Sequence, residues 1–316
     1  MSRTPFSVLL VLSLASIVVF GCASAAPLPP RAVELNQSGV EALQSGDLEK
    51  ASARFALALE FHPRFVDALV NLGLVELQRG SFREARKRLE KAVAVNRHVA
   101  QPHHGLGVLS EREGDTVRAT KHYRAALEVD PGFAPSRANL ARIHFVEGRL
   151  DHAREQFLRL TEVAPEVGAG WAGLIESMQR LGRQQEADDA LDRALLAAPD
   201  EPEVRLYAAR RAMRSGQWAE ADRGLEELAG AGGALARSAW GWLGVSKLMQ
   251  GARDQARQCA ERAMAIDRDD ALATYVMAMT VAGQRDPNSA AWMDRASRLA
   301  PGNSVVSWEL AAGRSR

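Results

Sequence analysis

The sequence predicts an all-α protein in which helix hairpins of constant length stack into a solenoid. The composition supports helices, because good helix formers dominate and aromatic residues make up only 6% of the chain. The decisive observation is a period of 34 residues, seen in glycines and, five residues after each glycine, in alanines. The glycines are Gly46, Gly80, Gly114, Gly148, Gly182 and Gly216, followed after 35 residues by Gly251. The alanines are Ala51, Ala85, Ala119, Ala153, Ala187, Ala221 and Ala256.

Within one unit the residue types describe two antiparallel helices joined by a tight turn. Apolar residues recur at i, i+3, i+4 and i+7 on the first helix, and the periodic glycine ends that helix in a left-handed conformation. Asp47, Ser81 and Asp115 follow such glycines and are suited to cap the second helix. Small residues, including Gly107 and Ala119, let the two helices approach closely. One hairpin cannot bury its apolar face alone, so neighbouring hairpins must stack.

This pattern resembles the tetratricopeptide repeat. The unit that begins at Ala100 carries the motif at Leu106-Gly107, Gly114, Ala119, Tyr123, Ala126 and Pro131. Ile175 replaces the first-helix glycine of the fifth unit, and Arg97 and Arg268 replace the closing proline of two others. The resemblance covers residues 32–301 and implies a right-handed α-α superhelical solenoid of about eight tetratricopeptide-type helix hairpins.

Residues 1–21 differ from everything that follows. Arg3 gives a positive start, and the apolar run from Phe6 to Phe20 is short for a bilayer span, so the segment is predicted to be a secretory signal peptide. A retained anchor helix is the alternative. The stretch Val19-Phe20-Gly21-Cys22 resembles a bacterial lipobox, which implies that Cys22 is lipidated. Cleavage after Ala23-Ser24-Ala25 is the competing prediction and would yield a soluble periplasmic or secreted protein.

The remaining segments flank the repeat array. Residues 22–31 form a Pro-rich tether, which we expect to be stiff and extended. Residues 302–316 are predicted to hold a short capping helix and a tail. Ala23 follows the lipidated cysteine where lipoproteins of the inner membrane carry Asp, so the resemblance implies an outer-membrane lipoprotein that faces the periplasm.

Charge and cysteine content exclude several classes of function. The chain has 40 basic and 39 acidic residues, and removal of the signal peptide with Arg3 leaves 39 of each. A neutral chain has no general attraction to nucleic acid or anionic lipid. Cys259 has no partner once Cys22 is processed, so we expect a free thiol. A basic run in the second unit, Arg83 to Lys91, is interpreted as a solvated outer face, with contact to anionic headgroups as the alternative.

The sequence favours a binding protein over an enzyme. Residues 168–173 match G-x-G-x-x-G, but a dinucleotide site needs a preceding strand that the periodicity does not predict. His98, His103 and His104 diverge in the repeat register, so we expect no metal site there. The repeats occupy nearly the whole mature chain, and we expect no catalytic domain and no cofactor.

The repeat family binds partners on the concave face, at positions 2, 5, 9, 12 and 13 of each first helix. The resemblance therefore implies a groove with an apolar start, a mainly basic centre, and an apolar and aromatic end. Its predicted residues are Val40, Leu43, Val70, Leu74, Leu77 and Val108, then Arg112, Arg142, Glu176, Arg180, Arg210 and Arg214, then Trp242, Val245, Leu248, Met249, Tyr275 and Met279. Some of the apolar positions are expected to pack against neighbouring helices. Such a trough suits an amphipathic or extended partner segment with acidic residues.

The overall plan of lipid, tether and repeat array is similar to that of the pilotins of type IV pilus secretins. It implies a membrane-anchored protein–protein interaction scaffold of the bacterial envelope that assists an outer-membrane machine. The alternatives are a scaffold lipoprotein of gliding motility or polysaccharide export, or an accessory subunit of an envelope enzyme. A nucleic-acid reader disagrees with the export signal and the neutral charge.

Overall fold

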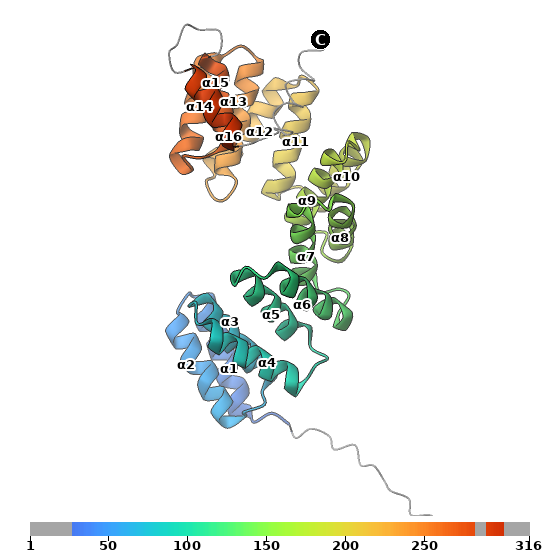
Figure 1. The fold of residues 1–316 in the computed structure, drawn as a ribbon, viewed down its shortest axis with the longest axis vertical. Helices are drawn as coiled ribbons and strands as arrows, with labels where there is room; N and C mark the ends of the chain where they lie inside the picture. The colour runs from blue at the N-terminus through green and yellow to red at the C-terminus, as the bar shows by residue number, and fades with distance from the viewer. Residues whose placement is uncertain (1–26, 282–288, 300–316) are drawn as a thin grey trace, which may run out of the picture.

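A computed structural model describes residues 27–281 and 289–299 (Figure 1). The predicted signal peptide, Cys22, most of the tether and the segment 302–316 lie outside the described residues, so those predictions stay untested. The chain winds upward in Figure 1 through a lower group of helices, a middle group and an upper group. None of the helices in the described ranges is long and apolar enough to cross a membrane.

Sixteen α-helices and no strands occur in the described residues, which confirms the all-α prediction. The first helices of the eight hairpins are α1 (Pro30–Gln44), α3 (Val66–Gln78), α5 (Ala100–Arg112), α7 (Ala134–Val146), α9 (Gly168–Arg180), α11 (Pro202–Arg214), α13 (Ala236–Met249) and α15 (Ala271–Val281). The second helices are α2 (Leu48–Phe61), α4 (Phe82–Val95), α6 (Thr116–Val129), α8 (Leu150–Val163), α10 (Gln184–Ala197), α12 (Trp218–Gly230), α14 (Arg253–Ile266) and α16 (Ser289–Leu299).

The periodic glycines end the first helices of seven hairpins in the predicted left-handed conformation. Their φ angles lie between 74° and 80°, from Gly46 to Gly251. Asp47 and Asp115 cap the following helices as predicted, each accepting a hydrogen bond from a backbone N–H three residues later. The corresponding prediction for Ser81 is wrong, because its hydroxyl makes no capping hydrogen bond to α4.

Small residues hold the helices close enough for large side chains of the second helix to enter the core. A Cβ added at Gly107 would lie 2.5 Å from the ring of Tyr123, which is fully buried. The fifth unit, which has Ile175 at the equivalent place, uses Gly173 instead. A Cβ there would lie 2.3 Å from the ring of Phe157 on the preceding hairpin. The resemblance of residues 168–173 to a dinucleotide motif is therefore explained by packing inside α9.

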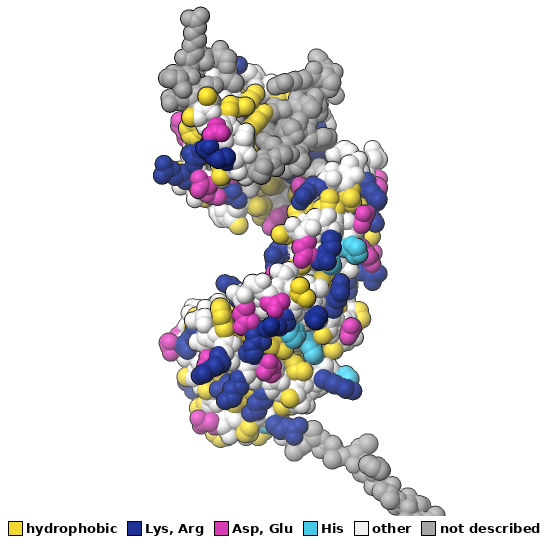
Figure 2. Space-filling model, viewed as in Figure 1, with side chains coloured by type: hydrophobic (Ala, Val, Ile, Leu, Met, Phe, Trp, Pro, Cys, Tyr) yellow, Lys and Arg dark blue, Asp and Glu magenta, His cyan; other side chains and the backbone are white. Residues whose placement is uncertain are grey.

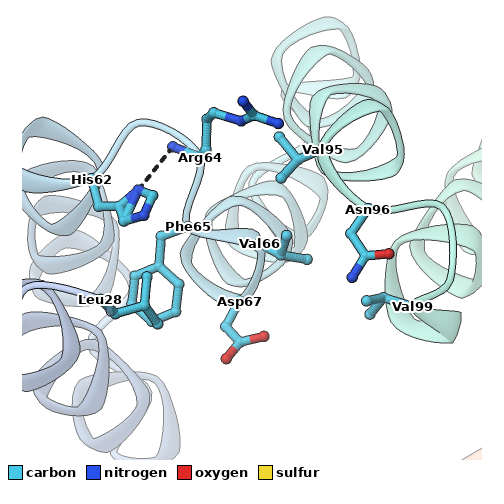
Figure 3. A pocket seen from close by; sticks show the side chains of 9 residues that line it. All are labelled: Leu28, His62, Arg64, Phe65, Val66, Asp67, Val95, Asn96 and Val99. Atoms are coloured by element: carbon cyan, nitrogen blue, oxygen red, sulfur yellow. Dashed lines mark hydrogen bonds between the residues drawn. The ribbon is translucent and has the colours of Figure 1, made fainter. Parts of the chain in front are cut away.

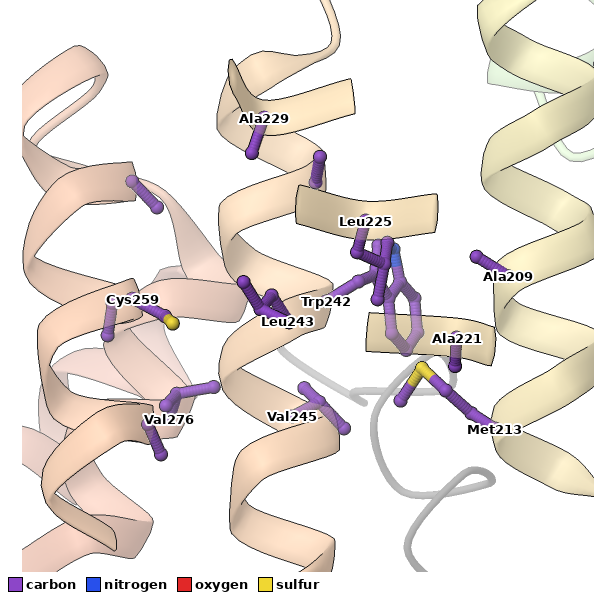
Figure 4. Close-up of a cluster of buried hydrophobic side chains, with 14 of the residues drawn as sticks. Ala209, Met213, Ala221, Leu225, Ala229, Trp242, Leu243, Val245, Cys259 and Val276 are labelled. Carbon is purple, nitrogen blue, oxygen red and sulfur yellow. The ribbon is translucent and has the colours of Figure 1, made fainter. Parts of the chain in front are cut away.

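The apolar core runs continuously through successive hairpins. Its largest cluster spans α11 to α15 and includes Trp242, Leu225, Leu243 and Val276 (Figure 4). Beside it, Asp222 on α12 accepts hydrogen bonds from Ser246 at 2.5 Å and from Lys247 at 2.7 Å, both on α13. These contacts tie the sixth hairpin to the seventh across the glycine-rich junction that carries the extra residue.

Candidate partner-binding groove

The first helices of the hairpins form a continuous inner wall. Each contacts the next one along the chain, from α1 with α3 to α13 with α15. The molecule is hollowed beside α5, α7, α9 and α11, while α8 and α10 lie on the opposite side (Figures 1 and 2). The inner wall is thus where side chains of several repeats can reach one bound segment.

The N-terminal third of the predicted groove is only partly open. Val70 and Leu77 are buried, at 5% and 7% exposure, and belong to the core. The other four predicted residues are half-buried: Val40, Leu43, Leu74 and Val108. Each of these packs against a core cluster and presents its remaining surface on the wall.

The C-terminal third contains two wrong predictions. Trp242 was placed at the edge of the groove but is 5% exposed, and Val245 is 1% exposed, so neither lines an open surface. Trp242 points into the cluster with Leu225 and Met213 (Figure 4). Leu248, Met249, Tyr275 and Met279 are half-buried and remain available as lining.

The basic centre is largely neutralised by neighbours one repeat away, which corrects the prediction of an open cationic trough. Arg142 forms an ion pair with Glu111 of the preceding hairpin. Arg214 pairs with Asp188 and is only 12% exposed.

Arg210 is the most deeply buried of these arginines, at 6% exposure. Its guanidinium lies 3.5 Å from the carboxylate of Glu176 and donates a hydrogen bond to Gln179 at 3.3 Å. The group is also stacked between the rings of Tyr207 and Trp242. Arg210 therefore acts as a structural tie rather than as open groove lining.

Two arginines of the wall keep their charge available. Arg112 and Arg180 are exposed, and within the described parts of the chain neither forms an ion pair. The guanidinium of Arg180 lies 4.7 Å from the ring centroid of Phe145, one hairpin earlier. Stacking covers one face of a guanidinium and leaves its N–H edge free for a carboxylate.

Contacts between adjacent repeats follow a spacing that the sequence interpretation missed. Glu111 with Arg142, Gln179 with Arg210, and Glu176 with Tyr207 are each 31 residues apart. The Tyr207 hydroxyl donates to Glu176 at 2.9 Å, and burial together with this carboxylate raises the tyrosine pKa. Acidic or amide residues 31 positions before an arginine or tyrosine were the signal that these side chains neutralise one another.

The three histidines of the predicted divergent cluster do diverge. His104 contacts the Ser136 hydroxyl at 3.0 Å and lies beside the rings of Tyr123 and Phe133. His103 contacts the backbone oxygen of Arg97, and His98 is exposed. Burial lowers the pKa of His104 to about 4, so its ring is neutral at pH 7. No group of three or more possible metal ligands occurs in the described ranges.

A separate pocket of about 660 Å³ lies near the N-terminal end, between the loops that join the first three hairpins (Figure 3). Leu28 of the tether enters it beside Phe65 and Val66, and Asp67 and Asn96 add polar atoms. Its lining is completed by His62, Arg64, Val95 and Val99. The tether therefore rests against the repeat array at its first described residues.

Sequence comparison agrees with the observed fold. Residues 37–82, 74–136 and 112–177 match family models described as Tetratricopeptide repeat. The chain belongs to the tetratricopeptide repeat family. No curated protein matches the sequence.

Similar solved structures include repeat proteins from bacteria. The structure of Pseudomonas aeruginosa pilF is 21% identical, with a TM-score of 0.56, and the match covers 67% of this chain and 96% of that one. A tetratricopeptide repeat protein from Parabacteroides merdae is 17% identical, with a TM-score of 0.56 and coverage of 80% and 100%. The Cut9–Hcn1 hetero-tetramer of the APC/C is 15% identical, with a TM-score of 0.62 and coverage of 88% and 55%. At these identities the likeness shows the fold alone.

Proposed function

We propose that this tetratricopeptide repeat protein is a scaffold of the bacterial envelope that binds a segment of a partner protein on its inner wall. One observation carries the proposal: the described chain is a stack of helix hairpins whose first helices form a single continuous wall. Half-buried apolar side chains and two unneutralised arginines face the hollow of that wall. Such a surface contacts an elongated ligand at many points and favours a peptide over a compact small molecule.

The envelope location rests on the sequence before the first helix. The apolar segment before Gly21-Cys22 and the tether support a lipoprotein of the outer membrane that faces the periplasm, with a soluble periplasmic or secreted protein as the alternative. A lipid anchor would hold the first repeats close to the membrane, because only a short tether separates Cys22 from α1.

Within the envelope, the plan of lipid, tether and repeats supports a role in assembling or stabilising an outer-membrane machine, such as a pilus secretin. Gliding motility and polysaccharide export use scaffolds of the same plan, and an accessory subunit of an envelope enzyme is a further alternative. The partner carries acidic residues in this proposal, because Arg112 and Arg180 are the exposed charges without partners on the central wall.

Site-specific photo-crosslinking in the cells that make the protein tests the scaffold function. A photoreactive residue would replace Leu74 or Val108 on the inner wall, and Lys87 or Lys121 on the outer face as the control. We expect the inner-wall positions to crosslink to one common envelope protein, identified by mass spectrometry. Crosslinks to that protein from the outer positions alone would place the binding surface elsewhere and contradict the proposal.

A further inference from the structure

Arg112, Val146 and Arg180 occupy the same place in three consecutive hairpins. Each is the last residue of its first helix, in α5, α7 and α9 respectively, and successive members are 34 residues apart. All three side chains are exposed, and Val146 is 74% exposed although it is apolar. We call these three residues the central row.

The charges of the central row differ from those of the arginines around it. Arg142 and Arg210 are neutralised by Glu111 and Glu176, whereas neither arginine of the row forms an ion pair in the described parts of the chain. Arg180 is oriented by its stacking on Phe145. The row thus presents a cation, an apolar side chain and a second cation in a line across the wall.

The spacing of the row selects the conformation of a ligand. Neighbouring packed helices lie about 8–10 Å apart. A polyproline II segment rises about 3.1 Å per residue and repeats every three residues, so every third side chain points the same way at intervals of about 9 Å. A β-strand alternates its faces every two residues and does not present i and i+3 together.

We infer that the central row binds a partner segment in the polyproline II conformation with the pattern carboxylate, two residues, apolar residue, two residues, carboxylate. The inference rests on the proposed function and names the chemistry of its ligand. The carboxylates pair with Arg112 and Arg180, and the apolar residue covers Val146. A polyproline II segment has no internal hydrogen bonds, so it bends with a superhelical wall more readily than an α-helix does.

The competing conformation makes a different prediction. An α-helix rises about 1.5 Å per residue, so a helical ligand needs intervals of seven residues to match the same row. Two peptides with the same acidic and apolar residues at three-residue and seven-residue spacing therefore distinguish the two conformations.

Fluorescence anisotropy with labelled synthetic peptides and the purified full-length protein in detergent tests the inference. The probe peptide carries Glu, Leu and Glu at three-residue spacing, with Pro at the other positions. Its controls are a peptide with Gln in place of both Glu residues and an α-helical peptide with seven-residue spacing. We expect the probe to bind roughly tenfold more tightly than the Gln control, since each charge-assisted hydrogen bond contributes at least about that factor.

Variants of the row and of the outer face complete the test. Arg112→Gln and Arg180→Gln should each weaken binding of the probe by roughly fivefold to tenfold, and Val146→Ser by roughly threefold. Lys87→Gln and Lys121→Gln are matched controls, because both lysines are exposed on the outer helices α4 and α6, and they should leave affinity unchanged. All five positions are exposed, so circular dichroism should show unchanged folding.

Tighter binding of the seven-residue peptide would overturn the inference, as would equal binding of the Gln control or equal loss in the lysine variants. Absence of binding by every peptide would overturn it as well. If inner-wall crosslinks still capture a partner in that case, the scaffold function stands and only the central row is wrong.

Discussion

The guanidinium of Arg210 lies 4.4 Å from the ring centroid of Trp242, which belongs to the next hairpin. Its other partners are Tyr207 on its own helix and Glu176 on the preceding hairpin. One side chain therefore connects α9, α11 and α13. A residue predicted to recognise ligands instead joins three repeats in a stack where each repeat otherwise contacts only its neighbours.

Replacing Arg210 with Ala should destabilise the array. The change breaks a buried ion pair and leaves the Glu176 carboxylate and two aromatic rings without their partner, which costs about 3 kcal/mol. Hydrogen exchange should accelerate in α9, α11 and α13 more than in α1 to α4. Arg180→Ala is the control, because Arg180 is exposed and its cation–π contact contributes about 0.5–1 kcal/mol. Equal effects of the two substitutions would show that Arg210 is not a tie between repeats.

Two glycines in helices should respond to Ala in opposite directions. A Cβ at Gly173 would lie 2.3 Å from the Phe157 ring, so Gly173→Ala should destabilise by about 1–3 kcal/mol through overpacking. At Gly224 the nearest atom is the Ala209 Cβ at 3.6 Å, an ordinary contact. Gly224→Ala should therefore stabilise by about 0.5–1 kcal/mol through helix propensity. Urea unfolding of both variants measures the difference, and stabilisation by Gly173→Ala would contradict the packing at α9.

Stability should fall on mild acidification. Burial lowers the pKa of His104 and of His144 to about 4, whereas an unfolded histidine has a pKa of about 6.5. Between these values the unfolded chain binds more protons, so the free energy of unfolding is fully present above pH about 6.5 and declines towards pH about 4. The double variant with His104→Gln and His144→Gln should show a shallower dependence on pH in this window. An unchanged slope would show that other groups cause the loss.

Removal of residues 271–316 should leave a folded array whose last hairpin is less protected. Cys259 is 7% exposed and packs in the same cluster as Val276 of α15, and burial raises its thiol pKa (Figure 4). In a Cys22→Ser background, the full chain should react slowly with a thiol reagent and the truncated chain much faster. Circular dichroism should show that α1 to α14 remain helical, because repeats are stabilised mainly by their neighbours. Complete loss of helical signal would contradict a modular array.

Lipidation of Cys22 should be detectable directly. A fatty-acid analogue supplied to the cells should label the wild-type protein and not the Cys22→Ser variant, and the labelled protein should fractionate with the outer membrane. A soluble wild-type protein beginning at Ala26 would instead establish cleavage after Ala25. This experiment decides the localisation independently of the binding surface.

Much of the fold was predictable because its causes are local and repeated. A glycine at φ near +75° ends a first helix, and a small residue such as Gly107 receives a large one such as Tyr123. These requirements recur in every unit with the same spacing, so helix positions and the stacked arrangement could be read from residue types alone. Only details failed, such as the missing cap at Ser81, where a hydroxyl does not have to use its nearest N–H.

The candidate site was less predictable, because exposure depends on side chains one repeat away. Arg180 and Arg210 both occupy inner-wall positions, yet the first is exposed and the second is 6% exposed. The sequence by itself determined which helix faces form the wall, since that follows from helical periodicity. The tertiary structure alone decided which arginines are neutralised and buried and which remain open to a ligand. The physical reason is that an arginine is long enough to reach a carboxylate or a ring on the adjacent hairpin, and whether one stands there is not a property of its own repeat.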